Sequence, residues 1–311
     1  MAVRIVTDST ADLPPQMAQE LGITVVPVYV GFGEKTYRDG VDISQDELYQ
    51  KMVAGPAHPT TSQPTPADFA SVYRKLLQET DEIVSIQLTG KLSGTYNSAL
   101  QGKEMVSGGS RIEVVDSLSV SMGLGLITMA AARVARAGEG LQAVMEEVRQ
   151  AIPQMHLWGL FDTLKYLAKG GRIGKAKALL GSVLNIKPIL TMRDGELHPA
   201  GVARTRAKGI ERLFDLVKNT LNLQELAIVH STTPDEAQRL RDRISSIFDK
   251  SPIHISRLGP ALGVHAGPGA LILALREKVA SIGQEASEGE SAKKRLSLTS
   301  LHLPKLSFSR L

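Results

Sequence analysis

The stretch Leu92-Ser93-Gly94-Thr95-Tyr96-Asn97-Ser98-Ala99 decides how this chain is interpreted. An apolar run at residues 83–88 precedes it and is typical of a buried strand, and a helical pattern follows it. Open α/β sheets bind ligands at such junctions, because the first turn of a helix has unpaired N–H groups and partial positive charge. Ser93 and Thr95 add hydroxyl groups and Gly94 lets the backbone approach closely, so the stretch predicts a carboxylate or phosphate site. The alternative is an ordinary helix start capped by Ser93 or Thr95.

The composition indicates a globular protein and excludes several classes of function. Of the 311 residues, 42% are hydrophobic and 22% are charged, which is ordinary for globular domains. The absence of cysteine excludes disulfides, thiolate zinc sites and cysteine nucleophiles, and it suits a reducing compartment. Aromatic residues make up only 4%, and the net charge of +4 lies partly in the C-terminal segment. We therefore expect no nucleic-acid partner.

The hydropathy pattern gives no sign of a membrane protein. No apolar run reaches the roughly 18 residues that a membrane span requires, and no signal-peptide pattern precedes the first predicted strand. The sequence therefore predicts a cytoplasmic protein without integral membrane insertion.

Strands and helices alternate through the first half of the chain, which predicts a mostly parallel sheet with flanking helices. The predicted strands are residues 3–7, 23–30, 83–88 and 111–117, and residues 31–42 are expected to be loop-rich. Beyond Pro153 a predicted hairpin at residues 187–200 is mixed with helices, and a turn is predicted at residues 263–269. This pattern predicts an N-terminal α/β domain at 1–153 and a C-terminal mixed α/β domain at 154–280. The charged segment 281–311 is expected to be a disordered tail.

The sequence contains no standard catalytic signature. The glycine-rich run at residues 170–175 fails the spacing of a phosphate loop, and the seven histidines lack metal-ligand spacing, so we expect neither a metal nor a cofactor. The remaining candidates, all predicted to lie in loops, are Thr61 or Ser62, Ser93, Thr95 and His265. These groups can donate hydrogen bonds to an anion, and His265 also adds charge when it is protonated. Alternatively, Ser93 and His265 are the nucleophile and base of a hydrolase or phosphotransferase.

Eight pieces of sequence, in order along the chain, resemble the DegV family of bacterial fatty-acid-binding proteins, the FakB subunits of fatty acid kinase. They are residues 6–13, 61–65, 92–99, 115–117, 167–173, 185–190, 203–206 and 265–269. The resemblance implies a two-domain α/β fold with a fatty acid held between the domains. It also implies that Thr61, Ser93 and His265 bind the carboxylate. A second set of residues is expected beside them: Ser62, Gly94, Thr95 and Gly267.

In this family a separate kinase subunit phosphorylates the bound carboxylate with ATP, and the acyl phosphate then enters phospholipid synthesis. The resemblance therefore implies a lipid carrier that has no catalysis of its own and has a kinase partner. Arg172 and Arg204 match basic family positions, and we expect them to dock the kinase or balance phosphate charge. The alternative for both arginines is a solvated surface position or a cation at a helix end.

The acyl chain of such a ligand needs an apolar tunnel, because each buried methylene contributes roughly 0.8 kcal/mol. Two apolar stretches of the sequence are candidates for its walls, although core packing is the alternative for every residue in them. They are Leu124, Leu126, Ile127 and Met129 in the first, and Ala178, Leu179, Leu180, Val183 and Leu184 in the second.

Overall fold

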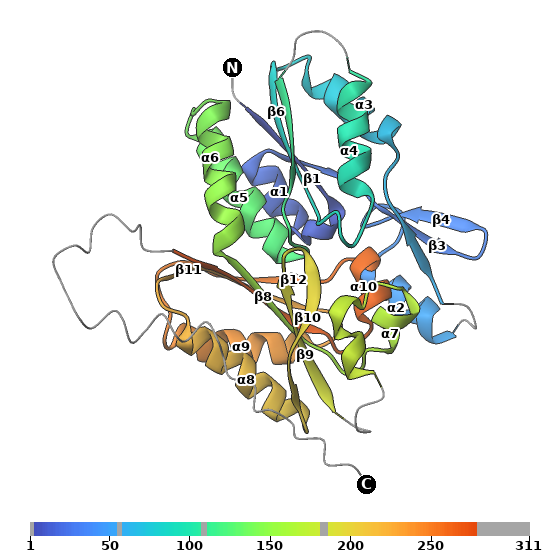
Figure 1. The fold of residues 1–311 in the computed structure, drawn as a ribbon, viewed down its shortest axis with the longest axis vertical. Helices are drawn as coiled ribbons and strands as arrows, with labels where there is room; N and C mark the ends of the chain where they lie inside the picture. The colour runs from blue at the N-terminus through green and yellow to red at the C-terminus, as the bar shows by residue number, and fades with distance from the viewer. Residues whose placement is uncertain (1–2, 55–57, 107–110, 181–185, 279–311) are drawn as a thin grey trace, which may run out of the picture. The chain divides into compact units, whose positions relative to one another are not determined.

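The computed structural model describes residues 3–54, 58–106, 111–180 and 186–278 of the chain. Residues up to Lys278 form one compact unit (Figure 1). The predicted tail at 281–311 lies outside the described residues.

Four parallel strands form the first sheet, in the order β2-β1-β6-β7. They are β1 (Arg4–Asp8), β2 (Ile23–Val26), β6 (Glu82–Gln87) and β7 (Arg111–Asp116). The chain moves from β1 to β2 on one side and returns to pair β6 on the other side of β1. The strand order therefore reverses between β1 and β6. The crevice at the carboxyl ends of the strands at such a point is where open sheets bind ligands.

Helices cover both faces of this sheet. One face packs against α3 (Pro66–Leu76) and α4 (Thr95–Glu104), and the other against α5 (Met122–Arg136) and α6 (Leu141–Ala151), as Figure 1 shows. A shorter helix, α1 (Pro15–Leu21), begins at a proline and ends at Gly22.

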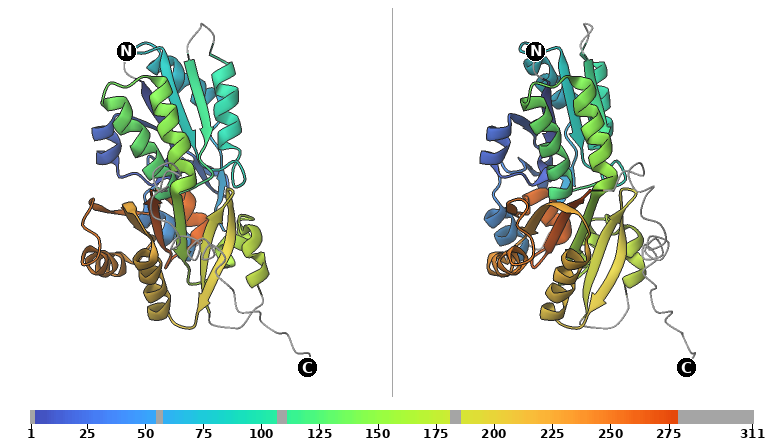
Figure 2. Two further views of the ribbon diagram at one scale, coloured as in Figure 1. Left: turned by 60° about the vertical axis from the view of Figure 1, so that its left-hand side comes forward. Right: turned by 90° about the vertical axis from the view of Figure 1, so that its left-hand side faces the viewer.

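Six strands form the second sheet, in the order β10-β9-β8-β13-β11-β12. They are β8 (Met155–Leu160), β9 (Lys187–Arg193), β10 (Glu196–Ala203), β11 (Leu223–His230), β12 (Ile253–Arg257) and β13 (Leu271–Glu277). All neighbours are antiparallel except β11 and β12. Helices α8 (Arg206–Asn219) and α9 (Pro234–Ser245) cover one face (Figure 2), and α5 packs against the other.

The largest hydrophobic core is shared by both sheets, because α5 lies between them. Ile5 and Val84 of the parallel sheet belong to the same buried cluster as Ala227 and Val229 of the mixed sheet. The predicted fold class, a parallel sheet with flanking helices followed by a mixed α/β part, is confirmed. The division of the chain at Pro153 stays a prediction.

A third sheet, small and antiparallel, is absent from the sequence-based prediction. It contains β3 (Tyr29–Phe32), β4 (Lys35–Arg38) and β5 (Thr60–Ser62), in the order β4-β3-β5. The prediction of one strand at 23–30 is wrong because Pro27, which has no N–H group to continue a ladder, separates β2 from β3. Helix α2 (Gln45–Ala54) follows β4, and Ser44 and Glu47 form a capping box at its start.

One further prediction of local structure is corrected. The turn predicted at 263–269 is largely a helix, α10 (Pro260–Ala266), which has proline at its first position and ends at Gly267 with φ of 72°. The second apolar stretch of candidate tunnel walls begins in a 3-10 helix, η3 (Gly174–Leu179), and residues 181–185 lie outside the described part. Among the described residues, no helix is long and apolar enough to cross a membrane.

Candidate functional site

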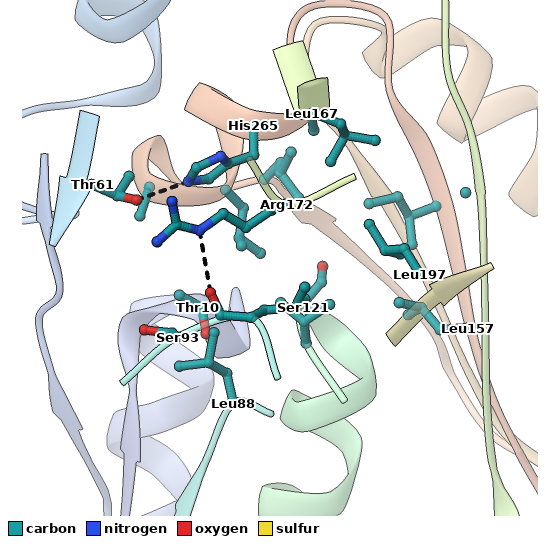
Figure 3. A pocket seen from close by; sticks show the side chains of 18 of the residues that line it. Thr10, Thr61, Leu88, Ser93, Ser121, Leu157, Leu167, Arg172, Leu197 and His265 are labelled. Carbon is teal, nitrogen blue, oxygen red and sulfur yellow. Dashed lines mark hydrogen bonds between the residues drawn. The ribbon is translucent and has the colours of Figure 1, made fainter. Parts of the chain in front are cut away.

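A cavity of about 110 Å³ lies at the carboxyl ends of β1 and β6, where the strand order reverses. Its walls are mostly aliphatic and come from both sheets and from α7 (Lys165–Lys169). They include Leu88, Leu157, Leu167, Leu190, Leu197 and Ile272. Polar side chains also reach the cavity, namely those of Thr10, Thr61, Ser93, Ser121, Arg172 and His265. Figure 3 shows that Thr61, His265, Arg172 and Ser93 gather at one end, whereas Leu157 and Leu197 lie at the other.

Thr61 and His265 form a hydrogen-bonded pair at the polar end. Thr61 lies on β5 and His265 on the last turn of α10, and Thr61 Oγ1 is 2.8 Å from His265 Nε2. The imidazole lies against Gly170, where a Cβ atom would be 2.0 Å from Nδ1. A residue with any side chain at position 170 would therefore push the imidazole away from Thr61.

Burial keeps His265 neutral. Loss of hydration, together with the nearby charge of Arg172 and the neighbouring His58, lowers the pKa of His265 to about 4. His265 Nδ1 is buried and has no hydrogen-bond partner among the residues that the structure describes. We place the ring proton on Nε2, because an unpaired acceptor is tolerated more readily than an unpaired N–H. Nε2–H then donates to Thr61, and the Thr61 hydroxyl is left to donate into the cavity.

Ser93 forms its hydrogen bonds within its own loop. Its Oγ is 2.9 Å from Thr95 Oγ1 and accepts from the Thr95 backbone N–H at 3.3 Å. Thr95 is buried and is the first residue of α4, whose N-cap position is Gly94 without a side-chain cap. The expectation that Ser93 or Thr95 is the N-cap is therefore wrong. When Thr95 donates both of its protons to Ser93 Oγ, the Ser93 hydroxyl proton is free to point at a ligand.

Arg172 places a positive charge at the same end of the cavity. Its Nε donates to the carbonyl of Leu92 at 3.3 Å, and a terminal nitrogen donates to the carbonyl of Gly170 at 2.7 Å. Figure 3 shows the guanidinium beside the Thr61–His265 pair. The guanidinium therefore lies in the candidate site itself rather than on an outlying surface.

The other predicted residues are divided between the cavity and its surroundings. Ser62 is exposed and borders the cavity. Gly94 contacts the amide of Gln63, and Gly267 contacts the ring of Tyr166 with no space for a side chain. Arg204 is exposed, follows β10, and is not among the residues that line the cavity.

Two sequence-based expectations about the site are wrong. None of the described tunnel-wall candidates lines the cavity, because those on α5 are packed in the shared core; Val183 and Leu184 lie outside the described residues. The candidate residues do not all lie in loops either, since Thr61 is on a strand and His265 is on a helix. Ser93 and His265 are not hydrogen-bonded to each other. Each of them is hydrogen-bonded to a threonine instead.

Besides the aliphatic walls, three residues of the site were missed, namely Thr10, Ser121 and Gly170. Thr10 follows β1, as Ser93 follows β6, and neighbouring parallel strands end at the same edge of a sheet. That pattern could have identified Thr10. Ser121 and Gly170 reach the site through packing that leaves no signal in the sequence around them.

Comparison with known proteins shows which family this chain belongs to. The family model for DegV, described as an uncharacterised family, matches residues 2–278. The chain belongs to the DegV family. A DegV domain-containing protein of Deinococcus radiodurans is 40% identical over 281 residues, which cover 88% of this chain and 98% of that protein.

Solved structures of DegV proteins have the same fold. One is described as showing fatty acid binding of a DegV family protein from Thermus thermophilus; it has a TM-score of 0.83 and 36% identity, and the match covers 89% of this chain and all of that one. Another, from Eubacterium ventriosum, is described as a stearic-acid-binding protein; it has a TM-score of 0.80 and 28% identity, with 88% and 98% covered. The predicted membership of the DegV family is confirmed. In the described part of this DegV chain, no group of three or more His, Asp or Glu residues is arranged to hold a metal ion.

Proposed function

We propose that this DegV protein binds a long-chain fatty acid and presents its carboxylate to a separate ATP-dependent fatty acid kinase. The solved DegV structures described as fatty-acid binding support the ligand class. The observation that carries the proposal is the cavity itself, which is aliphatic at one end and has hydroxyl, imidazole and guanidinium groups at the other (Figure 3).

The polar end suits a carboxylate. A desolvated carboxylate needs several donors, and hydrogen bonds to a charged group are worth about 1.5–3 kcal/mol each. Thr61 and Ser93 each have a hydroxyl proton that is not required by their partners, and Arg172 supplies the balancing charge. His265 holds Thr61 in place and, with a pKa of about 4, is neutral at pH 7.

The aliphatic end suits an acyl chain that enters by spreading the walls. The cavity of about 110 Å³ is smaller than a cavity of about 150 Å³ that holds benzene. A long acyl chain therefore requires the leucine side chains around it to move apart. Roughly 0.8 kcal/mol per buried methylene is available to drive this movement, so affinity is expected to rise steeply with chain length.

The position of the polar end supports presentation to a partner. Thr61 and Ser93 are half-buried, and the neighbouring cavity residues Ser62 and Gln63 are exposed. The carboxylate would therefore lie close to the surface while the acyl chain is enclosed. A kinase could reach the head group without the ligand leaving the protein, and Arg172 and Arg204 remain candidates for its contact.

The proposed function is tested by comparing ligands that differ only in the head group. We expect delipidated protein to bind octadecanoate at least tenfold more tightly than 1-octadecanol, and Ser93→Ala and His265→Ala to reduce this difference. Ser246→Ala, at an exposed serine on α9's C-terminal side, is the matched control. Equal binding of acid and alcohol by the wild-type protein would overturn the carboxylate site.

The kinase step needs its own assay. Acyl phosphate is expected only when the loaded protein, ATP and a fatty acid kinase subunit are present together. Acyl phosphate formed by this chain and ATP alone, or hydrolysis of acyl esters by it, would favour the enzyme alternative. The geometry gives that alternative little support, because Ser93 and His265 each bond to a threonine.

A further inference from the structure

We propose that Asp12 and Asp39, two buried acids outside the cavity, position helix α10 and thereby His265, and that ligand binding favours the protonated form of Asp12. This inference rests on the proposed function, because His265 is taken as part of the ligand site. Neither acid lines the cavity, so each acts through another residue and is a positioning residue.

The two acids hold the first turn of α10. Asp12 Oδ1 accepts from the Gly259 N–H at 2.8 Å, and Asp39 Oδ1 accepts from the Ala261 N–H at 3.2 Å. These N–H groups belong to the helix start, where no intrahelical partner is available. The Asp12 backbone also takes part, because its carbonyl accepts from the Ser256 hydroxyl. Since α10 has only seven residues, fixing its first turn also fixes the turn that carries His265.

The acids also lie directly behind the cavity wall. The Ser121 hydroxyl, which faces the cavity, donates to Asp12 Oδ2 at 2.5 Å. Asp8, a third buried acid, accepts from Thr10 and from the Leu88 N–H at 2.9 Å, and both of these residues also line the cavity. A negative charge in the cavity is therefore separated from these carboxyl groups by a single layer of side chains.

Burial and mutual repulsion favour the neutral forms of these acids. Loss of hydration, reinforced by Asp39 and Asp8, raises the pKa of Asp12 to about 8. Burial likewise raises the pKa of Asp39 to about 6 and raises that of Asp8. In the described part of the chain, no ion pair neutralises any of the three.

Few other ionisable groups face Asp12. Asp8 approaches from β1, Asp39 follows β4, and Tyr49 approaches from α2. Arg257 of β12 is paired with the exposed Asp46. Tyr49 has a pKa well above its ordinary value because of burial. With a pKa of about 8, Asp12 changes its charge between pH 7 and 9, the range in which the coupling is tested.

The direction of the coupling between ligand binding and protonation of Asp12 follows from thermodynamic linkage. A bound carboxylate adds negative charge on the cavity side of Ser121, the residue that separates Asp12 from the cavity. This charge raises the pKa of Asp12 further, so binding is accompanied by proton uptake near pH 8. By reciprocity, affinity for the fatty acid falls as pH rises through the pKa of Asp12. His265, with a pKa of about 4, does not titrate in this range. Protons can reach Asp12, because it also lines a separate groove of about 710 Å³.

The test measures octadecanoate affinity between about pH 7 and about pH 9.5 for the wild type and three variants. We expect the affinity of the wild type for octadecanoate to fall about tenfold as the pH rises over this range, which is within the usual size of coupling between sites. Asp12→Asn keeps the hydrogen bonds of the protonated acid, so it is expected to retain the affinity at pH 7 and to have a flat profile. Asp12→Ala removes the hydrogen bond to Gly259, and its affinity for octadecanoate is expected to be about tenfold lower at every pH. Asp42→Asn, at an exposed acid paired with Arg38, is the matched control and should follow the wild type.

The outcomes separate this inference from the proposed function. If Asp12→Asn shows the same pH profile as the wild type, the coupling is absent and the inference is overturned. If Asp12→Ala folds and binds like Asp12→Asn, the positioning role is overturned; if it does not fold, the profile of Asp12→Asn still decides. Ser93→Ala and His265→Ala are measured alongside. If they leave affinity unchanged, the proposed carboxylate site fails instead.

Discussion

Two hydroxyl groups at the polar end of the cavity are held in opposite ways. Ser93 is bonded to Thr95, two residues away in the same loop. Thr61 is bonded to His265, 204 residues away, with one partner on a strand of the small sheet and the other on α10. The first pair is a product of local backbone geometry, whereas the second exists only when distant parts of the chain have packed together.

This difference determines which substitutions damage the site. The Ser93–Thr95 pair lies at the start of α4 and involves two residues of one loop. The Thr61–His265 pair depends on Gly170, on α10 and on the acids behind it. We therefore expect the distant pair to be the more fragile of the two, and the predictions below test this expectation.

The largest effect is expected from Gly170→Ala. The added methyl group would be 2.0 Å from His265 Nδ1, so the imidazole must move and its bond to Thr61 is lost. We expect the affinity for octadecanoate to fall by about a hundredfold, since a misplaced side chain both loses its hydrogen bond and occupies the site. Isothermal titration of delipidated protein measures the change.

Two controls show whether this loss acts through His265. Gly140→Ala adds the same methyl group at a position where, apart from the adjacent backbone, no described residue lies within 4 Å, and it should leave affinity unchanged. The double variant Gly170→Ala/His265→Ala should bind no more weakly than His265→Ala, because the clash has been removed. Additive losses in the double variant would mean that Gly170 acts on the site by another route.

An intermediate effect is expected from removing one hydroxyl at a time. Thr61→Val should cost more affinity than Ser93→Ala, because it removes a donor and also leaves His265 Nε2 without its partner. Losses of about thirtyfold and about tenfold correspond to one or two hydrogen bonds to a charged group. Thr36→Val, at an exposed position of β4, is the control for the threonine change. Equal losses for the two variants would remove the distinction between the local and the distant pair.

The same distinction explains what could be predicted from the sequence. The loop with Ser93 was identified because strand, loop and helix start follow one another within one short segment. The parallel sheet was predicted for the same reason, because each of its units is continuous in sequence. Thr61 and His265 were candidates because hydroxyl and imidazole groups can bind an anion, and the resemblance to the family implied that they bind the carboxylate. Their bond to each other could not have been inferred from spacing across 204 residues.

The errors arose where tertiary structure decides local structure. Residues 29 and 30 were predicted to end a strand of the parallel sheet, and residues 31–42 were expected to be loop-rich. Instead, residues 29–32 form β3, which pairs with β4 and β5 in a separate sheet after Pro27. The apolar residues of α5 read as tunnel walls, but two sheets enclose this helix and its side chains fill the core between them. Apolar periodicity shows that a helix face is buried, and it does not show whether protein or ligand covers that face.

The smallest effect is expected from removing residues 281–311. Among the described residues, those that line the cavity lie between Thr10 and Ile272, and both hydroxyl pairs lie within the same limits. The family model also ends at residue 278. A chain that ends at Ala280 should therefore bind octadecanoate with the affinity of the full chain, within about twofold, when both are measured side by side. A larger loss would mean that the final segment contributes to ligand binding, and the two pairs would then not account for the carboxylate site on their own.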